Sequence, residues 1–157
     1  MNATTHQRRA AAPGEEGRQA VMAVAALATL DELEQAVARL GRPASRDLRS
    51  PEIGLVMLRG RIGGDGAPFN LGEATVTRAA VRLETGEVGM SYLLGRDPIR
   101  ARLAAVIDAV WLRGDETLVK TVFLDPVRAR IEAERRERAE RTAATRVDFF
   151  TLVRGED

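Results

Sequence analysis

Residues 61–83 read RIGGDGAPFNLGEATVTRAAVRL, and residues 84–96 continue as ETGEVGMSYLLGR. The glycine and proline cluster at residues 63–68 marks a turn, and the run that follows it predicts a long strand. Thr85-Gly86 predicts a two-residue hairpin turn and a short strand returning beside the long one. Arginine recurs along the stretch at Arg61, Arg78, Arg82 and Arg96. Because guanidinium groups bind carboxylates and phosphates well, the stretch predicts a β-hairpin that contacts an anionic group.

The expected turn also fixes an expected register for the hairpin. With Thr85-Gly86 as the turn, Leu83 faces Val88, and the alternating apolar side chains gather on one face that packs on helices. The other face carries Arg78 and Arg82 beside small residues, which leaves open space in front of their guanidinium groups. Such a face fits an anion site or a contact with a partner, and it fits a solvated sheet face equally well.

The composition is that of one folded domain. The chain has 157 residues, 45% of them hydrophobic, which is enough to build a core. A formal net charge of +1 argues against nucleic acid as a partner, since proteins that bind it nonspecifically are usually strongly basic. The basic residues are almost all arginines, with one lysine at Lys120. Arginine suits bidentate contacts with anions, but a GC-rich genome explains the bias equally well.

Several chemistries are excluded by the residues that the chain lacks. It has no cysteine, which rules out disulfides, iron–sulfur ligation, thiolate-bound zinc and a cysteine nucleophile. Its single histidine, His6, lies near the N-terminus, so a histidine-based catalytic triad or metal site is not expected. No apolar run approaches the roughly 20 residues of a membrane span. We therefore expect no metal and no membrane contact, and a cysteine-free chain fits the cytoplasm.

The first part of the chain predicts a leader and a helical hairpin. Residues 1–13 lack a signal-peptide pattern, and we interpret them as a disordered leader before a single domain at residues 14–157. Apolar residues at helical spacing predict a helix over residues 14–29. Thr29 and Glu32 have the spacing of a capping box, which predicts a second helix from Thr29 to a C-terminal cap near Gly41.

The segment after this hairpin predicts a buried strand. Residues 42–50 are polar and are expected to form a connection. Pro51 can open a strand but is not expected in its middle. Residues 53–58 are almost continuously apolar, which is typical of a strand buried on both faces. In the loop that follows, Gly63 and Gly64 can cradle a phosphate, but a plain turn between strands is favoured because the P-loop ending is missing.

Two further helices are expected from Asp-Pro pairs. Asp97-Pro98 predicts a helix that packs on the apolar face of the hairpin, with Asp108 close to its apolar stripe. A buried carboxylate at Asp108 can be catalytic, but an ion pair with an arginine is favoured. Asp125-Pro126 predicts a charged helix to about Ala144, which is either solvated or laid against a partner. Together these elements predict an α+β fold with an antiparallel sheet of about four strands packed against several helices.

The C-terminal stretch is the second informative one. Phe149 and Phe150 are adjacent aromatics after a solvated helix, and Arg146 and Arg154 bracket them. Adjacent residues of a strand point to opposite sides, so one phenylalanine can enter the core while the other faces a partner. Aromatics beside arginines are typical of interface anchors. An ordinary strand that closes the sheet explains the stretch equally well.

The motifs at residues 61–66, 69–82, 95–97, 107–109 and 146–155 resemble those of a known family in order and spacing. The family is the G subunit of the bacterial carbon–phosphorus lyase system, and the resemblance runs from about residue 17 to 155. It carries over no established catalytic residue.

The resemblance implies an accessory subunit in cytoplasmic phosphonate breakdown. The expected partners are the H, I and J subunits, two copies of each in a symmetric core, with the ATPase-like K and L subunits associated. The complex is expected to transfer an alkylphosphonate to the ribose C1 of ATP with release of adenine. MgATP is then a substrate of the complex, and this chain alone binds no cofactor. Two alternatives remain open: a non-catalytic adaptor of the same assembly, and an independent nucleotide-binding transferase with Asp108 or Glu73 as general acid or base.

Overall fold

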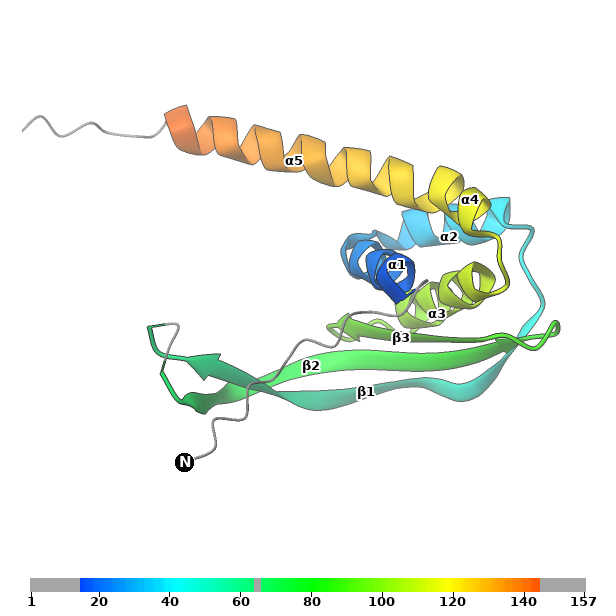
Figure 1. The fold of residues 1–157 in the computed structure, drawn as a ribbon, viewed down its shortest axis with the longest axis horizontal. Coiled ribbons are helices and arrows are strands. Elements are labelled where there is room, and N and C mark those ends of the chain that lie inside the picture. Colours follow the sequence, from blue (N-terminus) through cyan, green and yellow to red (C-terminus); the bar gives the residue numbers. More distant parts are fainter. Residues whose placement is uncertain (1–14, 64–65, 145–157) are drawn as a thin grey trace, which may run out of the picture.

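The protein has two layers, with all of its helices on one side of one sheet (Figure 1). The structure is a computed structural model and describes residues 15–63 and 66–144. The sheet in this part of the chain has three antiparallel strands in the order β1-β2-β3. The elements are α1 (Glu15–Leu27), α2 (Leu30–Arg39), β1 (Ser45–Arg61), β2 (Pro68–Leu83), β3 (Val88–Leu94), α3 (Pro98–Leu112), α4 (Glu116–Val119), the π-helical turn η1 (Lys120–Leu124) and α5 (Asp125–Ala144). The α+β class and the N-terminal helical hairpin are confirmed.

The helix starts follow the local signals in the sequence. The Thr29 hydroxyl accepts from the backbone N–H of Glu32 at 3.2 Å, and the Thr29 N–H donates to the Glu32 carboxylate at 2.8 Å, which completes the expected capping box. The Asp97 carboxylate accepts from the backbone N–H of Arg100 at 3.0 Å, with Pro98 at the first helical position of α3. None of the helices in the described residues is long and apolar enough to cross a membrane.

Helix α3 is the centre of the core. It lies on β2 and β3, with α1 and α2 against its other side (Figure 1). Nine of its residues are buried, and eight of them form the continuous run Ala104–Trp111, so buried side chains occur on every side of the helix, as expected for a helix enclosed by other elements. Its close approach to the sheet depends on Gly89, because a Cβ there would lie 1.9 Å from the carbonyl oxygen of Ala105. The expected packing of this helix on the hairpin is confirmed.

The expected register of the hairpin is wrong by one residue. Arg82 pairs with Val88, and Arg78 pairs with Tyr92. The loop has three residues instead of two, with Gly86 at φ 113°. On β3 this places Gly89, Ser91 and Leu93 under the helices and leaves the larger Met90 and Tyr92 on the opposite face. The physical reason is the close contact with α3, which a glycine and a serine permit and larger side chains would prevent.

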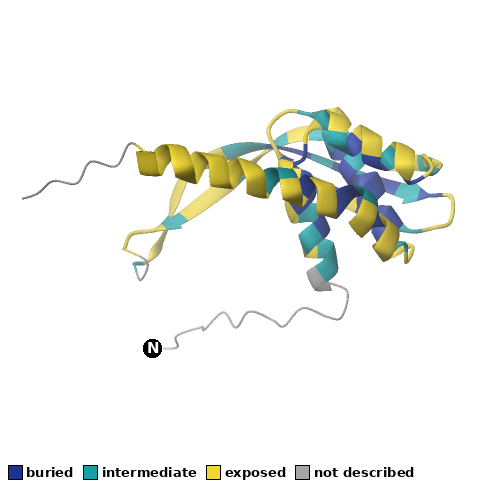
Figure 2. Cartoon of the chain, turned by 90° about the horizontal axis from the view of Figure 1, so that it is seen from above, coloured by how far each residue is buried: buried dark blue, intermediate teal, exposed yellow. Residues whose placement is uncertain are grey.

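Strand β1 also differs from the expectation. It begins at Ser45, so much of the predicted polar connection is strand, and Pro51 lies inside it. Pro51 is tolerated because β1 is an edge strand whose register shifts between Arg49 and Glu52. Residues 53–58 are not buried on both faces: Leu55 is 63% exposed. The far part of the β1–β2 hairpin extends beyond the helices, which leaves these apolar side chains uncovered (Figure 2).

Helices α4 and α5 are joined through η1 into one continuous helical segment. Pro126 lacks an N–H and its ring would crowd the carbonyl of Val122 in a regular α-helix, and the wider π turn just before it relieves this conflict. Beyond its first turns α5 is exposed, as Figure 2 shows. Along α5, Glu137 pairs with Arg141, and Glu134 pairs with Arg130 at 2.9 Å.

We expect Gly89→Ala to destabilise the protein by about 3 kcal/mol, at the upper end for overpacking, because the new Cβ meets backbone atoms that cannot rotate away. The matched control is Gly54→Ala, a strand glycine with nothing within 4 Å of the added Cβ. It should change the free energy of unfolding by no more than about 0.5 kcal/mol. Urea denaturation of both variants measures the difference, and equal stabilities would contradict the close contact between α3 and β3.

Candidate functional site

The side of the sheet turned away from the helices, here called the open face, collects charged side chains. Alternation along β2 places Leu83, Val81 and Ala79 under the helices and therefore turns Arg78 and Arg82 to the other side. Their neighbours come from the paired strands. The charged and aromatic residues of the open face are Arg46, Arg49, Glu52, Arg78, Arg82 and Tyr92. One carboxylate therefore faces four guanidinium groups in this set.

Arg78 is held by contacts within the sheet. Its Nε donates to Oε1 of Glu52 at 2.5 Å, and its Nη1 lies 3.4 Å from the hydroxyl oxygen of Tyr92. Glu52 also accepts from Nη1 of Arg49 at 2.6 Å. The hydrogen bonds from Arg78 and Arg49 hold the pKa of Glu52 below its ordinary value. The small neighbours expected beside Arg78 are absent, because the observed register places Tyr92 there.

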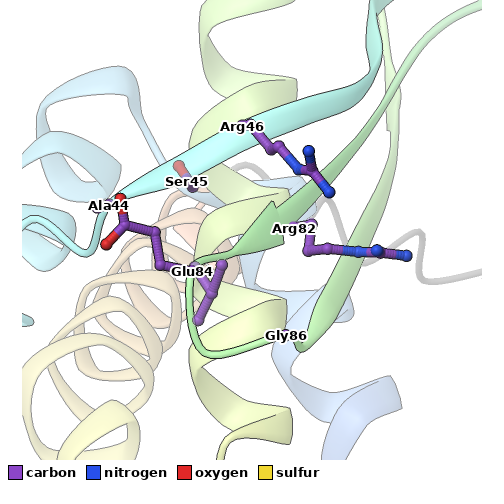
Figure 3. A pocket seen from close by; sticks show the side chains of 7 residues that line it. Ala44, Ser45, Arg46, Arg82, Glu84 and Gly86 are labelled. Atoms are coloured by element: carbon purple, nitrogen blue, oxygen red, sulfur yellow. The ribbon is translucent and has the colours of Figure 1, made fainter.

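Arg82 has a different environment. It lies directly opposite Arg46 across the β1–β2 pair. Figure 3 shows both side chains extending in the same direction, away from the Glu84 carboxylate. They line an open pocket of about 670 Å³ where β1 begins and the β2–β3 loop closes. The Nε of Arg82 is buried without a hydrogen-bond partner, and within the described part of the chain neither guanidinium has an ion pair.

The other expected site residues do not join this pocket. Arg61 lies at the tip of the β1–β2 hairpin, where its Nη1 donates to the carbonyl of Gly66 at 3.3 Å. Gly63 has φ 65° in the same turn, as expected for a glycine that joins two strands. Arg96 is exposed after β3, next to Gly95, whose N–H donates to Thr75. The structure therefore does not bring Arg61, Gly63 and Arg96 together with Arg78 and Arg82.

Five of the site residues expected from the sequence fall outside the described residues. They are Gly64, Arg146, Phe149, Phe150 and Arg154. The predicted leader at residues 1–13 lies outside as well, as does any C-terminal strand. The roles expected for these positions stay predictions.

Asp108 is an interior ion-pair residue. Its carboxylate is fully buried and accepts two hydrogen bonds from Arg18, from Nε at 2.8 Å and from Nη2 at 2.7 Å. Oδ2 also accepts from the backbone N–H of Met90 at 2.8 Å. The hydrogen bonds to Asp108 raise the pKa of Arg18. The expected pairing with an arginine is confirmed, and Glu73, the other candidate acid, is exposed on β2.

A second surface of interest is the far part of the β1–β2 hairpin, residues 53–63 and 66–75, here called the arm. It extends past α1 and α3 (Figure 1). Its exposed large apolar residues are Ile53, Leu55, Met57, Leu58, Ile62, Phe69 and Leu71. Several large exposed apolar side chains on one part of the fold are typical of a protein interaction surface.

Sequence reasoning missed Arg46, Glu52 and Tyr92. Arg46 lies in a stretch that has no alternating apolar pattern, so no local signal identified it as a strand residue. Tyr92 was assigned to the wrong face because the loop has one residue more than expected. Among the described residues, no three potential metal-ligating side chains lie together.

Comparison with known proteins gives a consistent result. Residues 16–155 match the family described as Phosphonate metabolism protein PhnG. The chain is also 56% identical over 137 residues to the Alpha-D-ribose 1-methylphosphonate 5-triphosphate synthase subunit PhnG of Rhizobium meliloti (strain 1021). This alignment covers 87% of the chain and 88% of that relative.

We expect Asp108→Asn to lower the free energy of unfolding by about 3 kcal/mol, because breaking a buried ion pair leaves its partner without compensation. The lower end of the usual range applies, since the side chain of Arg18 is 32% exposed and can regain water. Glu73→Gln, at an exposed position, is the control and should leave stability unchanged. Chemical denaturation distinguishes the two, and an Asp108→Asn variant as stable as the parent would remove the structural role of this carboxylate.

Proposed function

The chain belongs to the PhnG family of phosphonate metabolism proteins, and we propose that it acts as the corresponding subunit of an alpha-D-ribose 1-methylphosphonate 5-triphosphate synthase. The observation that carries this proposal is the 56% identity to a relative with that name, over nearly the full length of both chains. The proposed enzyme is therefore the complex, and the chain is one of its parts.

The proposed reaction moves an alkylphosphonate onto ATP. A phosphonate oxygen forms a bond to C1 of the ribose, the bond from C1 to the adenine nitrogen breaks, and adenine leaves after gaining a proton. MgATP and the phosphonate are both anions, which suits a chain whose open face carries four arginines and one carboxylate. We assign the chain a supporting role, with the nucleosidase chemistry on the I subunit.

The proposed assembly is a cytoplasmic complex with the H, I and J subunits, two copies of each, with the K and L subunits associated. Two features of this chain support a role in assembly. The arm presents apolar side chains that its own helices do not cover. Helix α5 extends away from the core with little of itself buried. Both features are typical of chains that are completed by a partner.

A second candidate function is a structural adaptor of the same complex, with no residue near the substrates. The apolar arm favours it, because the arm needs a protein partner but no ligand. An independent transferase is the weaker alternative, since Asp108 uses both carboxylate oxygens to hold Arg18 and Met90. A supporting subunit that lies near the substrates is expected to be protected by ATP in the assembled complex, whereas a structural adaptor is not.

The proposed function predicts that adenine release depends on this chain. The chain is co-expressed with the H, I and L subunits, and adenine release from MgATP and methylphosphonate is measured with and without it. We expect release by the complete set and a loss of at least tenfold when the chain is omitted, because the chain is proposed as a working part of the enzyme. The chain alone is expected to release no adenine. Unchanged release without the chain would contradict the proposal.

The arm should be required for assembly with the I subunit. We expect Leu55→Lys combined with Leu71→Lys to abolish co-purification, because two charges would be desolvated in the interface. Leu112→Lys is the matched control: Leu112 is also exposed, but it lies at the end of α3, outside the arm. Full retention of the I subunit by the double variant would exclude the arm as its contact. The same assay tests the proposed anchoring by Phe149 and Phe150, each replaced by alanine.

A further inference from the structure

The pair formed by Arg46 and Arg82 carries an inference beyond subunit assembly. We propose that these two guanidinium groups form a binding site for a doubly charged tetrahedral oxyanion, a phosphoryl or phosphonyl group. The choice of this ligand class rests on the proposed function, whereas the existence of an anion site rests on the geometry. Two sources share this chemistry: the triphosphate of the nucleotide and the alkylphosphonate.

The first argument is the placement of like charges. Arg46 and Arg82 are direct partners across the β1–β2 pair and lie on the same face of the sheet. Like charges directly opposite one another on a sheet are destabilising. The neighbouring arginines on this face, Arg49 and Arg78, share the carboxylate of Glu52. No such carboxylate serves Arg46 and Arg82 among the described residues, and an anionic ligand would complete the pattern.

The second argument is the state of the Arg82 side chain. Its Nε is buried and makes no hydrogen bond. A buried donor without a partner is uncommon in folded proteins, and a bound ion is one of the explanations for it. Figure 3 shows the Arg82 guanidinium extended beside that of Arg46, with the Glu84 carboxylate turned the other way. The positive charge is therefore not neutralised from within the pocket.

The third argument is the match between the pair and the ligand. One guanidinium can bind a carboxylate through two parallel hydrogen bonds, so a single arginine suffices for a single negative charge. A phosphoryl or phosphonyl group carries up to two charges on three oxygens, which fits two guanidinium groups better than one. The open pocket of about 670 Å³, which both side chains line, is large enough for such a group. Ala44, Ser45 and Gly86 line it without bulky side chains.

The test measures anion binding by the purified full chain. Tripolyphosphate and methylphosphonate are titrated separately by calorimetry, which distinguishes the two sources. We expect saturable binding of at least one probe, weakened about tenfold or more by Arg46→Gln and by Arg82→Gln, since each removes a charge-assisted hydrogen bond. The control is Arg59→Gln, an exposed arginine on β1 within the arm, which should bind like the parent.

Thermal unfolding gives an independent readout. The ligand should raise the Tm of the parent and of Arg59→Gln but not that of Arg82→Gln. Without ligand, Arg82→Gln should unfold at the same or a higher temperature than the parent, because the like-charge contact is relieved.

Three results would overturn the anion site. The first is equal weakening by Arg59→Gln, which would show nonspecific attraction. The second is binding unaffected by changes at Arg46 and Arg82. The third is an absence of binding to both probes; if Arg82→Gln then also loses the I subunit, the pair is assigned to a protein carboxylate instead. None of these depends on adenine release, so a failure of the site is distinguishable from a failure of the proposed function.

Discussion

The carboxylate of Asp108 is a fully buried charge, and its three hydrogen bonds tie together three separate elements. Arg18 belongs to α1 and Asp108 itself to α3. Met90 donates its backbone N–H from the outer edge of β3. A buried carboxylate is strongly unfavourable unless such partners surround it, so this contact favours the arrangement in which the three elements meet. The position of α3 on the sheet follows from this constraint, and the two faces of the hairpin follow from the position of α3.

Local signals in the sequence were sufficient for α2 and α3, but not for α4, for η1 or for the sheet. The capping box at Thr29 and the Asp97-Pro98 pair act within one helical turn, and the structure has both helices where they were predicted. The hairpin register depends on whether α3 can approach Gly89, which is a contact between distant parts of the chain. A loop longer by one residue was enough to exchange the faces of β3 and to place Tyr92 beside Arg78. Arg46 could not be identified as a site residue from the sequence, because only its pairing with Arg82 across the two strands places it at the site.

Covering the sheet from one side has consequences for the rest of the surface. The open face is left to arginines, with Glu52 as their shared carboxylate, and the arm is left with apolar side chains that no helix reaches. A continuous apolar run such as residues 53–58 is typical of a buried strand, but here no layer within the described part of the chain covers it. For a member of a family named for phosphonate metabolism, with a relative named as a synthase subunit, this division is consistent with the proposal of one surface for proteins and another for anions.

The π turn η1 sets the orientation of everything that follows it. A π turn accommodates one residue more than the regular helix, and one residue of a helix corresponds to a rotation of about 100°. Arg130 fastens the start of α5 to α2 through Glu32 and to the carbonyl of Leu27. Loss of one residue within residues 120–124 would therefore turn the outer part of α5 by more than a quarter of a revolution, or break this attachment. The length of this single turn thus fixes which side of the long helix is presented outward.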